Sequence, residues 1–126
     1  MLNEVIAWRK DFHKYPEIEF DLEITAAKVA KLLNAFGIEV KTNIGRSGVV
    51  GILKAGSSNN SIGLRADMDA LPLKENNTFN YCSTHEDKMH ACGHDGHMAM
   101  LLGAAKHLAT TKNFDGTVYF IFQPNE

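Results

Sequence analysis

The stretch GHMAMLLGAAKHLATTKNFDGTVYFIF, residues 96–122, joins two apolar patterns that predict different elements. Its first half has the three- and four-residue spacing of a helix that is buried on one face. The apolar positions are Met98, Leu101, Leu102, Ala105 and Leu108. Its second half, 117–122, is a short continuous apolar run, which is typical of a buried strand. A helix followed directly by a buried strand favours a layered α/β fold.

The residues before this stretch contain both patterns again. Two more helices and three more strands are expected, namely helices at about 2–16 and 22–36 and strands at 38–42, 48–54 and 61–66. Gly37 occupies the position where a left-handed residue often ends a helix. The Gly- and Ser-rich run 56–60 predicts a hairpin loop between the last two strands. Helices and strands in this order predict an α/β domain with a mixed sheet.

The composition bounds the class of protein. With 126 residues, 44% hydrophobic and 22% charged, the chain can form one globular domain with a modest core. A formal net charge of −2 gives no reason to expect a nucleic-acid or anionic-membrane partner. The first residues lack the apolar core of a signal peptide, so we expect a cytoplasmic protein. Cys82 and Cys92 are then expected as free thiols or metal thiolates rather than as a disulfide.

Four of the six histidines surround one cysteine, in the stretch that leads into the 96–109 helix. Residues 90–97 read HACGHDGH, and His85 lies just before them. Thiolate and imidazole are ligands of zinc and other borderline-soft metals, and the dipole of a helix N-terminus favours a thiolate. Cys92 and His94 are therefore predicted metal ligands, with Gly93 allowing the backbone to bend between them.

Carboxylates follow two of the predicted strands. Asp67 and Asp69 come directly after the 61–66 strand, and Glu126 comes after the 117–122 strand. Ligand sites of α/β sheets lie at the carboxyl ends of strands, so we expect the 67–91 segment and the 92–97 turn to lie together at the carboxyl ends of the 61–66 and 117–122 strands. A carboxylate there can bind metal, fix the tautomer of a liganding histidine, or accept a proton from water.

Four motifs in order resemble one family along nearly the whole chain. They are RKDFHKYPE (9–17), RADMDALP (65–72), MHACGHDGHMAMLLGAA (89–105) and GTVYFIFQPNE (116–126). Together they are similar to the amidohydrolase branch of the aminoacylase and carboxypeptidase metallopeptidases, which includes hippurate hydrolase, N-acetyldiaminopimelate deacetylase and the hydrolases of auxin conjugates. The resemblance implies a layered α/β/α zinc-peptidase-like domain with a mixed sheet, of which residues 1–126 form an incomplete, N-terminal part.

The resemblance also implies roles for particular residues. Cys92 and His94 match metal ligands, and Glu126 matches the general base. Asp67 and Asp69 match positions that support the ligands rather than bind the metal. His13, Pro16 and Glu17 match a motif to which we assign capping or packing. The family's remaining ligands, one glutamate and two histidines, would lie after residue 126.

The implied activity is hydrolysis of the amide bond of N-acyl amino acids with two divalent metal ions, Zn or Mn. The resemblance also implies a homodimer for the complete protein. This chain alone is expected to be inactive, because it lacks the later ligands. Two alternatives stay open: a metal-binding module without catalysis, and a Cys92 nucleophile activated by His90, His94 or His97.

Overall fold

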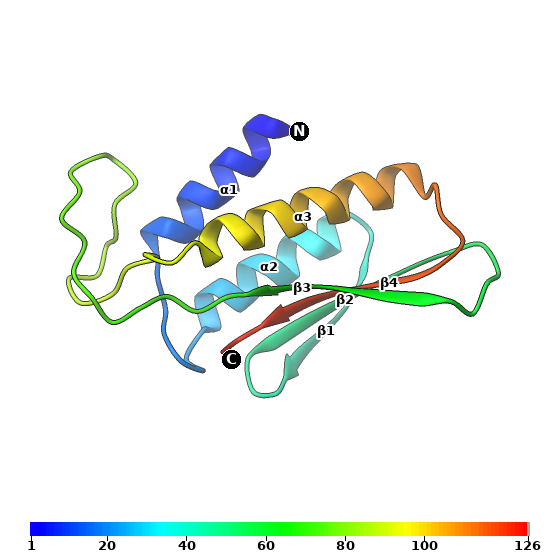
Figure 1. Cartoon of the computed structure of the whole chain (residues 1–126), viewed down its shortest axis with the longest axis horizontal. Helices are drawn as coiled ribbons and strands as arrows, with labels where there is room; N and C mark the ends of the chain where they lie inside the picture. Colours follow the sequence, from blue (N-terminus) through cyan, green and yellow to red (C-terminus); the bar gives the residue numbers. More distant parts are fainter. Residues whose placement is uncertain (126) are drawn as a thin grey trace.

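The computed structural model describes residues 1–125 and contains seven regular elements (Figure 1). They are α1 (Leu2–Lys14), α2 (Glu23–Ala35), β1 (Glu39–Ile44), β2 (Gly48–Ala55), β3 (Ser61–Asp67), α3 (His94–Thr111) and β4 (Gly116–Gln123). The element order confirms the order predicted from apolar spacing. Gly37 has a φ of 81°, so it adopts the left-handed conformation expected just after a helix.

The four strands form one mixed sheet in the order β1-β2-β4-β3. β4 pairs antiparallel with β2 and parallel with β3. The predicted hairpin at 56–60 is therefore wrong, because β4 lies between the two strands that this loop connects. The loop is held instead by Asp115, whose carboxylate accepts the backbone N–H groups of Ser57 and Ser58.

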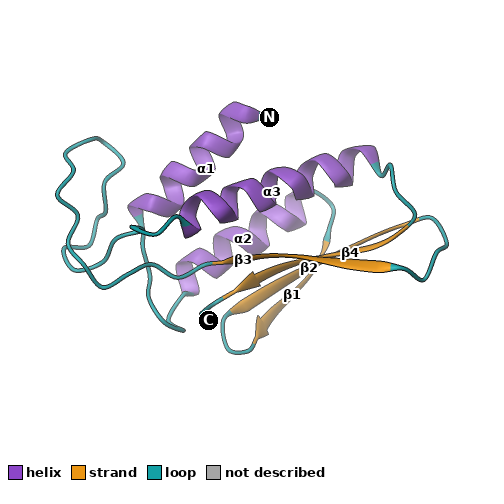
Figure 2. Cartoon of the chain, viewed as in Figure 1, coloured by secondary structure: helices purple, strands orange, loops and turns teal. Residues whose placement is uncertain are grey.

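All three helices lie on the same side of the sheet, α2 and α3 against its strands and α1 packed on α3 (Figures 1 and 2). Alternate residues of β4, Val118, Phe120 and Phe122, are buried in the shared core with helix residues such as Val29 and Leu102. Between them Tyr119 remains 37% exposed. Among residues 1–125 no helix lies on the second face, so only two layers of the expected three are described. None of the described helices is long and apolar enough to cross a membrane.

The connection from α1 to α2 depends on one carboxylate. Glu17 Oε1 accepts hydrogen bonds from the backbone N–H and the hydroxyl of Thr25, and Oε2 accepts one from the N–H of Ile24. These N–H groups belong to the first turn of α2, where no intrahelical acceptor exists. Pro16 is fully buried beside it. The structure thus confirms capping by Glu17 and packing by Pro16.

Replacing Glu17 should destabilise the fold through this cap. We expect Glu17→Ala to lower the free energy of unfolding by about 1–2 kcal/mol, because two backbone donors and one hydroxyl lose a charged acceptor. Urea denaturation followed by circular dichroism measures the change. The control is Glu86→Ala, a change at an exposed loop position; equal stabilities for the two variants would contradict the capping role.

Candidate metal centre

The parallel pairing of β3 and β4 brings their carboxyl ends to one edge of the sheet. Asp67 is opposite Gln123 in this register, and the next N–H, that of Met68, donates to the carbonyl of Gln123 over 2.8 Å. From here the chain runs through a long loop, 68–93, and returns to the same edge at the start of α3 (Figure 2). The 67–91 segment and the 92–97 turn, which carry the candidate site residues and were predicted to lie together, meet at this edge of the sheet.

The contact that joins them is a hydrogen bond of His94. Its Nδ1 lies 2.8 Å from the backbone carbonyl oxygen of Asp69. A carbonyl oxygen only accepts, so Nδ1 carries the proton and donates. In the neutral ring, Nε2 then has the free lone pair that a metal ligand needs.

The carboxylates of the two aspartates lie on either side of this ring. Asp69 Oδ1 is 3.1 Å from His94 Nδ1, and Asp67 Oδ2 is 3.7 Å from Nε2, beyond hydrogen-bond distance. Asp67 is itself buried and paired at 2.7 Å with Arg65, which also donates to Gln123. The structure therefore brings Asp67, Asp69 and His94 together, as the sequence predicted. Their roles towards a metal remain predictions.

Cys92 lies two residues before this imidazole and is exposed. Between them Gly93 has a φ of 134°, a conformation that residues with a Cβ rarely adopt, and its carbonyl accepts the N–H of His97 in the first turn of α3. The backbone bend expected at Gly93 is thus present. Neither described cysteine forms a disulfide.

The geometry fits a metal only as a partial site. Within residues 1–125 no three His, Cys, Asp or Glu side chains are close enough to hold an ion together. His94 is nevertheless oriented as a ligand, and the buried Asp69 Oδ1 completes no hydrogen bond among the described residues. A buried carboxylate oxygen without a donor is costly unless something else satisfies it. A borderline-soft ion bound by Cys92 and His94 fits this donor set, with its other ligands from elsewhere.

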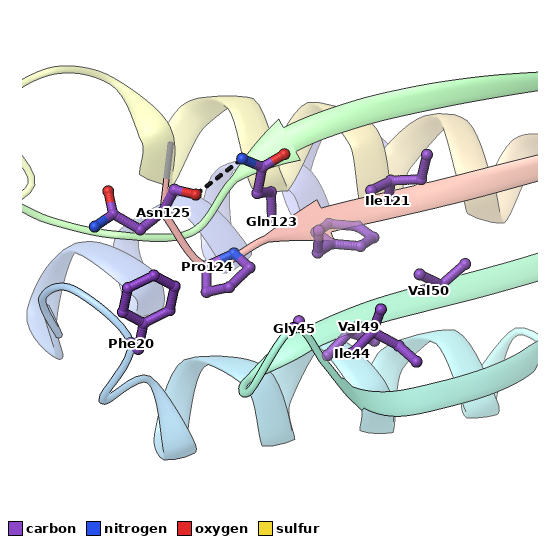
Figure 3. Close-up of a pocket in the computed structure, with 11 residues that line it drawn as sticks. Phe20, Ile44, Gly45, Val49, Val50, Ile121, Gln123, Pro124 and Asn125 are labelled. Atoms are coloured by element: carbon purple, nitrogen blue, oxygen red, sulfur yellow. Dashed lines mark hydrogen bonds between the residues drawn. The ribbon is translucent and has the colours of Figure 1, made fainter.

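Glu126, the predicted general base, lies outside the described residues. Pro124 and Asn125, which precede it, line a mostly apolar cavity of about 340 Å³ between β4, the β1–β2 turn and Phe20 (Figure 3). Gln123 donates to the carbonyl of Asn125 at its rim. The cavity is at the same edge of the sheet, but Asp67, Asp69, Cys92 and His94 are not among its lining residues.

His90 is a feature that the sequence did not distinguish from its neighbours. It is 4% exposed, and both ring nitrogens lack a hydrogen-bond partner among the described residues. Burial lowers the pKa of His90 to about 4, and the nearby Asp95 carboxylate opposes this only in part. The imidazole is therefore neutral at pH 7, so it adds no positive charge that would repel a metal ion.

This burial predicts acid destabilisation of the metal-free chain. An unfolded histidine takes up a proton near pH 6.5, whereas folded His90 does so only near pH 4, so stability is lost as pH falls between these values. From pH 7 to pH 5 the loss through His90 should be about 2 kcal/mol. Urea unfolding in the presence of a chelator measures it, and His90→Gln should flatten the profile. Parallel profiles for the two proteins would contradict the effect.

Comparison with known proteins places these features in a family. The model of peptidase family M20/M25/M40 matches residues 63–126. Hippurate hydrolase of Campylobacter jejuni is 54% identical over 118 residues, which are 94% of this chain and 30% of the relative. The N-acyl-L-amino acid amidohydrolase of Geobacillus stearothermophilus is 42% identical over 98% of this chain and 34% of its own length.

Solved structures show the same architecture. A putative aminohydrolase from methicillin-resistant Staphylococcus aureus superposes with a TM-score of 0.94 at 37% identity, covering 98% of this chain and 33% of that protein. The Bacillus subtilis YXEP protein, described as a dinuclear metal-binding peptidase of the M20 family, gives 0.92 at 36% identity, with coverage of 97% and 35%.

The chain thus spans about a third of the length of these relatives, and the matched region contains Asp67, Asp69, Cys92 and His94. The resemblance drawn from the four motifs is confirmed. On the strength of the family match and the shared fold, the chain belongs to peptidase family M20/M25/M40.

Proposed function

We propose that residues 1–126 supply part of a dinuclear metal site that hydrolyses the amide bond of N-acyl amino acids. The observation that carries the proposal is the orientation of His94, whose Nδ1 donates to the carbonyl of Asp69 while Nε2 makes no hydrogen bond within residues 1–125. A histidine fixed in this way is what metal enzymes use as a ligand.

The relatives support the reaction and the number of metals. Two of them are named as hydrolases of hippurate and of N-acyl-L-amino acids, and a third as an N-acetyl-L-cysteine deacetylase. The B. subtilis structure is of a dinuclear metal-binding peptidase. We extend these properties to the protein that contains this chain, with Zn or Mn as the metals. A homodimer and a cytoplasmic location are parts of the same proposal.

Each residue of the site then has a task. Cys92 and His94 would hold a divalent cation, and Asp69 keeps the His94 ring in the required tautomer. The cations would supply Lewis-acid polarisation of water and of the amide carbonyl. Asp67, neutralised in part by Arg65, places a carboxylate beside the metal-facing nitrogen. Glu126 would accept the proton of the attacking water and return it to the leaving amine.

Residues 1–126 by themselves are proposed to bind metal without turnover. Among residues 1–125 the site has two donors that suit a borderline-soft ion, Cys92 and His94, and no group of three possible ligands. Two-metal hydrolysis requires each ion to be held in place, and misplacement by about 1 Å can cost on the order of a hundredfold in rate. Metal binding without turnover by this chain is thus compatible with catalysis by a longer protein that includes it.

Metal binding by the chain tests the ligand assignment. Titration with Co²⁺ should give thiolate-to-metal charge-transfer absorption, with an affinity that increases with pH because the thiol must lose its proton. We expect Cys92→Ser to abolish the band and His94→Ala to weaken binding at least about tenfold. Cys82→Ser is the matched control and should keep the band. If Cys82→Ser abolishes the band instead, the assignment is wrong.

Hydrolysis assays test whether residues 1–126 alone are inactive. The chain, supplied with Mn²⁺ or Zn²⁺, should release no amino acid from hippurate or N-acetyl amino acids above the rate without protein. The full-length C. jejuni hippurate hydrolase, assayed in parallel, is the positive control. Metal-dependent turnover by the chain that Glu126→Gln abolishes would show that residues 1–126 contain a complete site.

A further inference from the structure

A buried imidazole on α1 connects the two segments that carry the metal centre. His13 is 2% exposed and lies near the end of α1. This end of the helix lies beside the start of α3 (Figure 1). The Nδ1 of His13 is 2.8 Å from Asp95 Oδ2, and its Nε2 is 2.9 Å from Glu75 Oε2. Glu75 belongs to the loop, and Asp95 follows His94 in the first turn of α3. One ring thus links both segments to α1.

Both partners of this ring are acceptors. Each carboxylate lies within hydrogen-bond distance of one ring nitrogen, so the ring is held on both sides. Arg9 adds a cation, with its Nε 3.0 Å from Asp95 Oδ2. The side chains of His13, Glu75 and Asp95 are each at most 3% exposed, so a carboxylate without a donor would be costly there.

The loop side of this cluster is closed by further contacts. Glu75 Oε1 accepts the N–H of Ser83, and hydrogen bonds from His13, Asn77 and Ser83 outweigh burial, so the pKa of Glu75 lies below its usual value. Phe79 and Tyr81 stack with centroids 4.0 Å apart, and each ring lies about 6 Å from that of His13. The loop therefore folds around His13 rather than around the metal ligands.

The helix side leads directly to the metal centre. Asp95 Oδ1 accepts the N–H of Gly96 in the first turn of α3, while Oδ2 is held by His13 and Arg9. These bonds fix the start of the helix on which His94 sits. Leu71 and Met89 exchange two backbone hydrogen bonds across the neck of the loop, close to Asp69. Movement of either segment would alter the His94–Asp69 contact.

From these contacts we propose that His13 is a positioning residue for the metal centre. By binding Glu75 and Asp95 at once, it fixes the loop and the start of α3 relative to each other, and so keeps His94 Nδ1 on the carbonyl of Asp69, which would leave Nε2 able to bind a metal. The sequence motif around His13 suggested only packing or capping. The inference rests on the proposed metal function, but its first effect is on the ring of His94.

The test compares His13→Gln with Thr25→Val, a matched control that removes another buried polar contact, at α2. Two-bond ¹H–¹⁵N spectra of the metal-free chain report the tautomer of His94. Zn²⁺ competition with a chromophoric chelator reports affinity. Both are measured at a temperature where circular dichroism shows every variant folded.

His13→Gln should replace the single Nδ1–H form of His94 by a mixture of tautomers and weaken Zn²⁺ binding about tenfold or more. Thr25→Val should leave both unchanged, whatever its loss of stability. A folded His13→Gln with the wild-type tautomer and affinity would overturn the proposal, as would equal effects of the two variants.

A second variant covers the case in which His13→Gln does not fold. Glu75→Gln keeps the shape of the side chain but has only one acceptor oxygen. It therefore loses the hydrogen bond from either His13 or Ser83. We expect it to show the same changes to a smaller degree, and a wild-type tautomer and affinity in this variant would overturn the proposal. If wild-type chain binds no Zn²⁺, the metal function fails, while the tautomer of His94 still tests the role of His13.

Discussion

The hydrogen bond from His94 Nδ1 to the carbonyl of Asp69 is the contact on which the candidate site depends. It joins the start of α3 to the segment that leaves β3, two regions separated by a loop of some two dozen residues. The sheet makes the contact possible, because parallel pairing of β3 with β4 places Asp67 beside Gln123 at one edge. The left-handed Gly93 then turns the chain so that α3 begins with its imidazole facing that edge. A carbonyl acceptor leaves the ring no choice of tautomer, and this single consequence makes Nε2 available to a metal.

Interactions between buried charged side chains, more than apolar packing, hold the loop and the helices together at this edge of the sheet. The 68–93 loop contains no helix or strand, and its inner side chains meet α1 through His13, Glu75 and Asp95. Burying a carboxylate is expensive unless cations and donors surround it, so such a cluster adds less net stability than an apolar core of the same size. It does constrain geometry, since each bond requires a particular direction. A site that needs its ligands placed within a fraction of an ångström benefits from that constraint. The neutral His90, whose ring makes no hydrogen bond to any described residue, lies in the same region and has the opposite effect, a loss of stability in acid.

Much of the fold follows from the sequence, and the failures have physical causes. Apolar spacing predicted every helix and strand in the right order, because each element buries one face. The hairpin at 56–60 was wrong because a turn-forming composition does not reveal that β4 inserts between the strands it connects. Asp67, Asp69 and His94 could be predicted to meet, since strand ends converge. The partners of His13 could not be predicted, because Glu75 lies in a loop without periodicity and nothing in the sequence distinguished Asp95 from the histidines around it. Glu126 lies outside the described residues, so its role rests on resemblance.

The coordination shell of a bound zinc ion tests the central claim most directly. The claim is that Cys92 and the oriented Nε2 of His94 bind one ion, with oxygen ligands completing the shell. Zn K-edge X-ray absorption of the chain loaded with one equivalent of Zn²⁺ should show one sulfur at about 2.3 Å and one imidazole nitrogen at about 2.0 Å, the remainder being oxygen. The imidazole signal should disappear in His94→Ala. A shell of oxygen alone, or one that His94→Ala leaves unchanged, would contradict the account.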